Sequence, residues 1–357
     1  MAGIYIHIPF CKTRCIYCDF YSTTRSELKS QYIRALCREL TERKEYLKGE
    51  AVETIYFGGG TPSQLSEEDF KEVFKTIEQV YGMREATEIT LEANPDDLTE
   101  EYIGMLHTLP FNRISMGIQT FDDATLQLLN RRHNATQAIE AVKHCRQAGF
   151  QNISIDLIYG LPGETEQRWA QDLQQAVSLD VEHISAYHLI YEEGTPLYKM
   201  LQQHSVSQVD EDSSLNFFST LIDTLSAAGY EHYEISNFCK PGMYSDPDFT
   251  AKLYMCGVRF MKGLQASRIY HFETKSTTRI RKNCGQMQFL LKWGMTSSTF
   301  RKVFTYKGKD FKSQKIGTFK TGNRFKISLI RGRLKAIFYL LTKDFGPLWK
   351  FWKKTFV

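Results

Sequence analysis

The sequence predicts an α/β fold in which six parallel strands and their helices form an open, TIM-like partial (β/α)6 barrel. Over the first 190 residues, short β-branched runs alternate with amphipathic helical stretches. The strand-like runs are almost continuously apolar, as expected for parallel strands that are covered on both faces. Six such units are too few to close an ordinary eight-stranded barrel.

The expected elements alternate regularly along the chain. The strands are, in order, Gly3–Ile8, Glu53–Phe57, Glu88–Glu92, Arg113–Ile118, Ile153–Tyr159 and His183–Leu189. Apolar residues at helical spacing between them predict the helices Ser30–Leu47, Ser66–Tyr81, Thr99–Leu106, Thr136–Gln147 and Glu166–Leu179. A further helix, Ser213–Ala228, and a strand, Tyr233–Ser236, follow before the pattern becomes irregular.

The balance of acidic and basic residues reverses near residue 245. Residues 1–245 carry 20 Lys and Arg against 36 Asp and Glu, whereas residues 246–357 carry 25 against 5. Such a switch typically marks a module boundary or a segment that meets polyanions. We therefore expect a core barrel over residues 1–190, an adjoining α/β segment over 191–245 and a basic carboxyl-terminal region over 246–357.

The composition is that of an ordinary globular protein, with 42% hydrophobic and 24% charged residues. No apolar run approaches the roughly 18 residues of a membrane helix. Residues 1–10 lack the features of a signal peptide. Closely spaced cysteines in a cytosolic protein more often bind metal than form disulfides. These observations predict a cytoplasmic protein without a membrane span.

Three cysteines follow the first expected strand with the spacing C-x3-C-x2-C, at Cys11, Cys15 and Cys18. Thiolates so close in sequence converge on one centre at little entropic cost. A structural zinc takes four protein ligands, whereas a 4Fe–4S cluster held by three thiolates keeps one iron open. The spacing therefore favours a 4Fe–4S cluster. A zinc site completed by a distant His or Cys, or three ordinary cysteines, remain the alternatives.

Polar and glycine residues follow the other strands. Gly58–Pro62 comes after the second strand, Glu92 after the third and Gln119 after the fourth, and Asp156 lies in the fifth. The carboxyl ends of parallel strands meet at one edge of a sheet, where ligands of such folds bind. Taken singly, each of these residues also fits a glycine turn or a salt bridge.

Five ordered sequence blocks carry a family resemblance. They are YIHIPFC (5–11) with its continuation to CDF (18–20), YFGGGTPS (56–63), EANP (92–95), RISMGIQTF (113–121) and IDLIYGLP (155–162). Together they resemble the radical S-adenosylmethionine family of oxygen-independent coproporphyrinogen III oxidase. Within it, the chain is most similar to the oxidase-like branch known as heme chaperones. The resemblance extends to about Tyr244, or roughly two-thirds of the chain.

The resemblance implies that S-adenosylmethionine occupies the open iron of the cluster through its amino and carboxylate groups. By the same likeness, Gly60 and Thr61 contact its methionyl part. Glycines let a backbone approach a ligand closely and present N–H groups to a carboxylate.

The matched positions Glu92, Gln119, Arg131 and Asp156 complete the cofactor site that the resemblance implies. A carboxylate suits the ammonium or the ribose hydroxyls, and Arg131 suits the carboxylate of the cofactor.

Aromatic residues and one histidine flank the cysteines. Tyr5 and Tyr17 are candidates to pack on the adenine or to shield the cluster, and ordinary packing is the alternative for both. His7, in the first strand, is expected to be a satisfied pocket histidine rather than a fourth cluster ligand, because the chemistry needs an open iron.

The resemblance leaves two functions. The first is a heme chaperone, with heme or porphyrin as cargo and with heme-recipient proteins and an electron donor as partners. The second is an oxidase that converts coproporphyrinogen III to protoporphyrinogen IX. The oxidases carry another cysteine two places after the triplet, where this chain has Phe20, and a longer segment before it. Both features favour the chaperone.

Residues 246–357 depart from the family. The branch continues with an H-N-x-x-Y-W motif tied to heme binding, but this chain reads DPDFTAKLY (246–254). Three accounts compete: a shifted reading frame, a divergent but folded domain, or a basic arm that binds nucleic acid or anionic lipid, with aromatics at Lys302–Lys309 and Trp349–Lys354. No nucleic-acid motif is present, so a nucleic-acid partner is not expected. A frame shift would spare cluster and cofactor binding and impair heme transfer.

Overall fold

The computed structural model describes residues 2–47, 49–245 and 252–256. Its strands are β1 (Ala2–Ile8), β2 (Val52–Gly59), β3 (Glu88–Ala93), β4 (Arg113–Gln119), β5 (Asn152–Tyr159), β6 (His183–His188), β7 (Glu231–His232), β8 (Asn237–Cys239) and β9 (Lys252–Cys256). Its helices are α1 (Lys29–Glu42), α2 (Glu67–Tyr81), α3 (Glu100–His107), α4 (Asp123–Leu128), α5 (Ala135–Gln147), α6 (Glu166–Ser178), α7 (Pro196–Gln202) and α8 (Glu211–Ala227).

The described strands form one sheet in the order β7-β8-β6-β5-β4-β3-β2-β1-β9. Neighbouring strands from β1 to β6 pair in parallel, β9 continues the parallel sheet beside β1, and β8 pairs antiparallel with β6. The two edge strands do not pair, so the sheet of described strands is open. The predicted six-unit partial barrel is confirmed.

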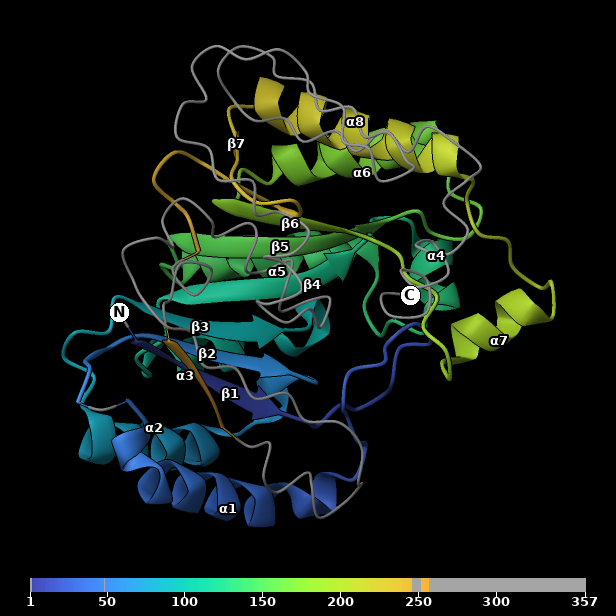
Figure 1. The fold of residues 1–357 in the computed structure, drawn as a ribbon. Helices are drawn as coiled ribbons and strands as arrows, with labels where there is room; N and C mark the ends of the chain where they lie inside the picture. Colours follow the sequence, from blue (N-terminus) through green and yellow to red (C-terminus); the bar gives the residue numbers. More distant parts are fainter. Residues whose placement is uncertain (1, 48, 246–251, 257–357) are drawn as a thin grey trace, which may run out of the picture. The chain divides into compact units, whose positions relative to one another are not determined.

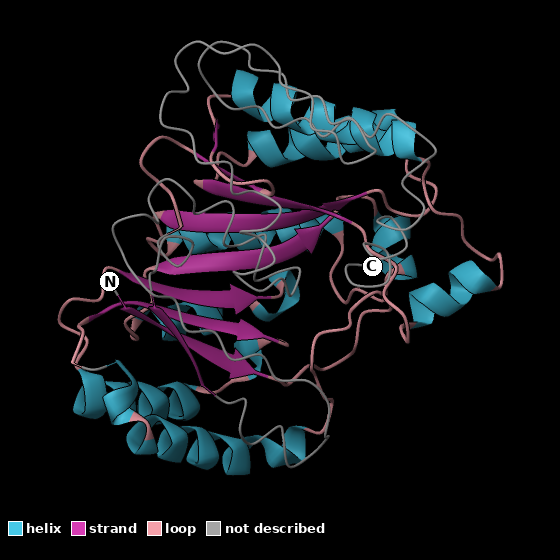
Figure 2. Cartoon of the chain, in the orientation of Figure 1, coloured by secondary structure: helices cyan, strands magenta, loops and turns pink. Residues whose placement is uncertain are grey.

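Helices lie beyond both ends of the sheet and behind its middle strands (Figures 1 and 2). In Figure 1, α1 and α2 lie beyond β1, α6 and α8 lie beyond β6, and α3 and α5 lie behind the middle strands. Buried apolar side chains recur at every second position of the strands, as Ile4, Ile6 and Ile8 do on β1. Polar side chains such as Arg113 and Ser154 are buried at positions between them, so the strands are not almost continuously apolar as predicted. The indole of Trp169 on α6 donates a hydrogen bond to the carbonyl of Phe217 on α8, at 2.9 Å.

Local sequence signals explain where the main helices begin. Ser66 and Asp69 form a capping box at the start of α2, and Asn134 and Gln137 form another at the start of α5. Asp122 caps α4 by accepting from the backbone N–H of Thr125 at 2.8 Å. Both α4 and α5 thus lie in the connection between β4 and β5.

Two expected elements differ from the structure. The helix predicted over Ser30–Leu47 ends at Glu42, and a separate 3-10 turn spans Lys44–Leu47. The strand predicted over Tyr233–Ser236 is wrong, because this stretch is the turn of the β7–β8 hairpin. The carboxylate of Glu234 accepts from the backbone N–H of Ser236 at 2.9 Å, which closes the turn.

Of the basic region predicted over residues 246–357, the structure describes only β9, and the rest lies outside the described residues. The domain limits near residues 190 and 245 stay predictions. None of the described helices combines the length and the apolar character that crossing a bilayer requires.

Candidate cofactor site

The cysteine-bearing segment is a closed loop that leaves the carboxyl end of β1. Backbone hydrogen bonds join Cys11 N–H to the Thr23 carbonyl at 2.9 Å and Thr23 N–H to the Pro9 carbonyl at 2.7 Å, which seals the base of the loop. Within it, the N–H of Cys18 donates to the carbonyl of Cys15 at 3.3 Å. All three cysteines are half-buried and free of disulfides. The loop therefore presents its thiols at the edge where β1 to β6 end.

A second segment, residues 129–132, holds this loop from the side of β4. The N–H of Ile16 donates to the carbonyl of Leu129 at 3.2 Å, and the amide of Asn130 donates to the carbonyl of Arg14 at 2.8 Å. Asn130 adopts the left-handed conformation, with φ of 59°, which asparagine tolerates better than most residues. The cysteine loop is thus anchored at points more than a hundred residues away in sequence.

Two side chains donate to cysteine sulfurs. Thr61 Oγ1 lies 3.4 Å from Cys11 Sγ, and Arg131 Nη1 lies 3.4 Å from Cys15 Sγ. A cation beside a sulfur favours the thiolate, which is the metal-binding form. Burial acts in the opposite direction and raises the pKa of Cys18 to about 11. Metal binding at this loop must therefore displace protons from the thiols.

The glycine block after β2 fits closely against the cysteine loop. Gly59 has φ of 114°, and a Cβ there would lie 2.6 Å from the ring of His7. A Cβ on Gly60 would lie 2.8 Å from the backbone carbon of Pro9. The N–H groups of these glycines are already used, by a Glu92 carboxylate oxygen at 3.1 Å and by the Ile8 carbonyl at 2.7 Å respectively. The structure therefore explains these glycines by close backbone approach rather than by free amides.

His7 is satisfied at both ring nitrogens. Nε2 lies 3.0 Å from the carbonyl of Tyr21, and a carbonyl only accepts, so Nε2 carries the proton. Nδ1 then accepts from the hydroxyl of Tyr5 at 3.2 Å. Burial lowers the pKa of His7 and keeps it neutral. These contacts agree with a pocket histidine that supports Tyr5 and is not a metal ligand.

Two half-buried carboxylates of the predicted site lie on β3 and β5, the strands on either side of β4. Glu92 on β3 accepts from the Tyr56 hydroxyl at 2.8 Å, and burial raises its pKa. Burial, followed by the negative charge of Glu92, raises the pKa of Asp156 on β5 to about 7. Arg113 on β4 opposes both effects through its positive charge. The pair thus forms an acidic interior that favours cationic groups or hydroxyl donors.

The side chains of Arg131 and Gln119 both lie close to the backbone of Gly117 on β4. Gln119 ends β4 with a positive φ of 75°, beside a register shift between β4 and β5. A Cβ on Gly117 would lie 2.8 Å from Gln119 Nε2 and 3.3 Å from Arg131 Nη2. Arg131 Nη2 also donates to Asn94 Oδ1 at 2.8 Å. A residue held at a rare backbone angle next to a buried guanidinium is typical of a ligand-binding site.

The two tyrosines of the predicted site have different surroundings. Tyr5 stacks on Tyr56 with ring centroids 5.9 Å apart, and Tyr56 in turn contacts Glu92. Tyr17 packs against a small apolar cluster of Leu129, Ile158, Leu161, Leu189, Tyr191 and Leu197, and burial raises its pKa. Tyr17 therefore screens the cysteine loop from water on one side, whereas Tyr5 belongs to the Glu92 side.

These residues fit a 4Fe–4S cluster with S-adenosylmethionine. Arg131 Nε is buried and has no partner among the described residues, so a donor is left for a ligand's carboxylate. In the described ranges, no three His, Cys, Asp or Glu side chains gather around a single-ion position. A lone zinc draws each sulfur to about 2.3 Å from one point, whereas each thiolate of a cluster binds its own iron.

Comparisons with known proteins agree with this geometry. The model of the radical SAM superfamily matches residues 5–176. A heme chaperone HemW from Lactococcus lactis is 36% identical over 269 residues, which cover 72% of this chain and 70% of the relative. The Bacillus subtilis heme chaperone HemW is 37% identical, over 70% of this chain and 66% of the relative.

This chain belongs to the HemW family of radical SAM proteins. It spans about two thirds of the length of these relatives. The solved structure of the coproporphyrinogen III oxidase HemN from Escherichia coli superposes with a TM-score of 0.61 at 27% identity, over 68% of this chain and 56% of that chain. Membership in the radical SAM superfamily implies a 4Fe–4S cluster and S-adenosylmethionine as cofactors.

Sequence reasoning missed several residues of this HemW-family site. Lys12, Asp97, Asn130 and Arg132 hold the cysteine loop, but charged and amide side chains in loops are ordinarily solvated, so no spacing singled them out. Gly117 was also missed. A glycine inside a strand pattern was the available signal, because such a glycine often marks a close approach of another group.

Proposed function

We propose that the protein holds its 4Fe–4S cluster on Cys11, Cys15 and Cys18. We further propose that S-adenosylmethionine binds to the chain through Tyr5, Tyr17, Gly60, Thr61, Glu92, Gln119, Arg131 and Asp156. When bound, the reduced cluster supplies the electron that cleaves the sulfonium of the cofactor. The observation that carries this proposal is Arg131, whose guanidinium lies 3.4 Å from a cysteine sulfur and keeps one buried N–H free of described partners.

Different side chains of this protein bind different parts of the cofactor. The free N–H of Arg131 orients the carboxylate of the cofactor. Glu92 and Asp156 accept from ammonium or hydroxyl groups, and Gly60 lets the segment after β2 pack against the backbone of Pro9, which brings Thr61 beside Cys11. Tyr17 and its apolar neighbours keep water away from the thiols.

We propose heme handling, rather than porphyrinogen oxidation, as the biological role. Phe20 stands at the position of the oxidases' additional cysteine and exposes 66% of its surface. The curated relatives at 36% and 37% identity are named heme chaperones. On this proposal, heme or a porphyrin is the cargo, a heme-dependent protein receives it, and a cytoplasmic electron donor reduces the cluster.

The test uses the full chain, reconstituted anaerobically with iron and sulfide. Hemin is titrated into it while the Soret band is followed, and a parallel sample receives coproporphyrinogen III, S-adenosylmethionine and a reductant. Saturable hemin uptake without protoporphyrinogen IX would support the proposal. Tight, stoichiometric uptake would also refute the expectation that a frame shift beyond residue 245 impairs heme transfer. Product formation would establish the oxidase, and a loaded cluster without hemin uptake would refute heme handling by this chain.

A further inference from the structure

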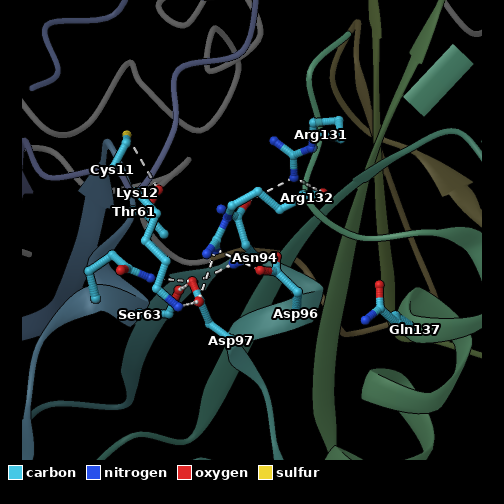
Figure 3. Close-up of polar contacts among 12 residues, drawn as sticks. Cys11, Lys12, Thr61, Ser63, Asn94, Asp96, Asp97, Arg131, Arg132 and Gln137 are labelled. Atoms are coloured by element: carbon cyan, nitrogen blue, oxygen red, sulfur yellow. Dashed lines mark hydrogen bonds and ion pairs between the residues drawn. The ribbon is translucent and has the colours of Figure 1, made fainter. Parts of the chain in front are cut away.

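One buried carboxylate connects four loops of the site. Asp97 Oδ1 accepts from Lys12 Nζ at 3.0 Å and from Arg132 Nη2 at 2.9 Å. Its other oxygen, Oδ2, accepts from Ser63 Oγ at 2.8 Å and from Gln64 Nε2 at 2.6 Å. The side chain of Asp97 is only 3% exposed. Figure 3 shows the charged groups converging on it.

The partners come from the carboxyl ends of successive strands. Lys12 lies in the loop after β1, Ser63 and Gln64 follow β2, Asp97 itself ends the 3-10 turn after β3, and Arg132 follows β4. A buried carboxylate is strongly unfavourable unless charge pairs and hydrogen bonds satisfy it. Asp97 therefore stabilises the structure only while all four loops stay in place. It acts as a crosslink between them.

Two routes lead from Asp97 to cysteine sulfurs. Lys12 is the residue next to Cys11, so the ion pair with Asp97 fixes the loop beside that thiol. Arg132 is the residue next to Arg131, whose Nη1 donates to Cys15 Sγ. Neither route requires Asp97 to touch a cofactor.

The second route is reinforced through hydrogen bonds. Ser63 Oγ, which donates to Asp97, accepts from the backbone N–H of Asn94 at 3.3 Å. Asn94 Oδ1 in turn accepts from Arg131 at 2.8 Å. Loss of the Asp97 charge would therefore loosen both the Lys12 side and the Arg131 side of the cysteine loop.

We propose that Asp97 is a positioning residue for the iron–sulfur cluster, acting through Lys12 and Arg132 on the loop that carries Cys11 and Cys15. This inference rests on the proposed cluster ligands and adds a residue that binds neither cluster nor S-adenosylmethionine. Asn at position 97 keeps the shape of the side chain but removes the charge that pairs with Lys12 and Arg132; Arg132 then keeps its ion pair with Asp96, at 2.9 Å. The retained cluster should then leave the protein faster, because its ligand loop opens more often.

The experiment measures cluster loss from the anaerobically reconstituted full chain. Iron release to a chelator is followed for the wild type and for Asp97→Asn, with iron and sulfide content measured at the start. We expect release from Asp97→Asn to be on the order of tenfold faster, since a buried ion pair loses one partner. Glu67→Gln is the matched control, because Glu67 pairs with Lys71 at 2.7 Å and accepts from Thr108 at 3.3 Å, and neither partner belongs to the cysteine loop. It should release iron within about twofold of the wild type.

Variants of Lys12 keep the test valid if Asp97→Asn fails to fold. The Lys12 side chain is 57% exposed, so its replacement spares the core. Lys12→Met should speed iron release by roughly threefold, and Lys12→Arg should restore a rate near the wild type, because a cation again reaches Asp97. A merely structural role would not produce this rescue.

The outcomes separate the two proposals. If the wild type takes up no cluster, the proposed cofactor site fails. If the wild type is loaded, and Lys12→Met and a folded Asp97→Asn release iron at the wild-type rate, the positioning role of Asp97 is overturned. Suppose that Lys12→Met speeds iron release, and that the variant carrying both Lys12→Met and Asp97→Asn releases iron more slowly than the product of the two single effects predicts. Both substitutions then act on the same crosslink, as the proposed positioning role requires.

Discussion

Replacement of Asp156 by Asn should flatten the pH dependence of stability. Asp156 lies half-buried on β5, where desolvation and the negative charge of Glu92 raise its pKa to about 7, while Arg113, Arg131 and a hydrogen bond from Ser185 partly offset them. In the unfolded chain the same carboxyl has its ordinary pKa of 3.8. Between these values the folded protein holds a proton that the unfolded chain has lost.

The difference between the two pKa values sets the direction and the magnitude of the change in the free energy of unfolding with pH. Because the folded state binds more protons, the free energy of unfolding falls as the pH rises from about 4 to 7. One pKa unit corresponds to about 1.4 kcal/mol, so a shift of roughly three units gives a loss of about 4 kcal/mol across this window. This value is an upper bound for Asp156 alone, since Glu92 titrates with it. Asn cannot ionise and removes the contribution.

Urea unfolding, followed by tryptophan fluorescence at several pH values between 4 and 8, measures this effect. The wild type should lose stability by up to about 1.4 kcal/mol per pH unit from this group, and Asp156→Asn should show a distinctly shallower slope. Asp212→Asn, which removes an exposed carboxylate of α8, should keep the wild-type slope. Identical slopes in Asp156→Asn and the wild type would refute the raised pKa of the Asp156 carboxyl.

Three further substitutions test the geometry of the site. Gly59→Ala should lower the free energy of unfolding by roughly 2 to 4 kcal/mol in urea titrations, because the new Cβ combines a positive φ with a clash on the His7 ring. A loss under about 1 kcal/mol would contradict the close approach of Gly59 to His7. Arg131→Met should weaken S-adenosylmethionine binding in equilibrium dialysis by at least about tenfold, since a charged hydrogen bond contributes about 1.5 kcal/mol or more, and unchanged affinity would place the carboxylate elsewhere. Asp122→Ala should cost about 1 kcal/mol or more, because it removes the cap of α4 together with the ion pair to Arg168, and calorimetry that shows no change would argue against both contacts.

The parallel core could be predicted because its signals are local. The six strands were found to within two residues at either end, since apolar β-branched runs leave few alternatives. The turn between β7 and β8 was mistaken for a strand because Tyr233 and Ile235 suggest β structure, whereas the deciding bond comes from the side chain of Glu234. The short helices α4 and α7 span too few residues to show a periodicity.

The residues of the candidate site likewise fall into those that the sequence indicated and those whose role only the structure shows. Cys11, Cys15 and Cys18 are close in sequence, so their spacing alone indicated a shared centre. Asp97 and Arg132 gain their roles only when loops from four strands meet, a long-range arrangement that no local pattern contains. The resemblance to a known family supplied residues such as Arg131, and the structure supplied the contacts that explain them.

The central claim is that three thiolates of one loop hold a cluster that contains several irons. Its most direct test is the iron, sulfide and zinc content of the anaerobically prepared full chain, compared with Cys15→Ala and with the control Cys37→Ala, whose thiol lies on α1 away from the loop. We predict about four irons and four sulfides per chain in the wild type and in Cys37→Ala, and a strong loss of both in Cys15→Ala. Stoichiometric zinc, or equal iron in all three proteins, would contradict the account.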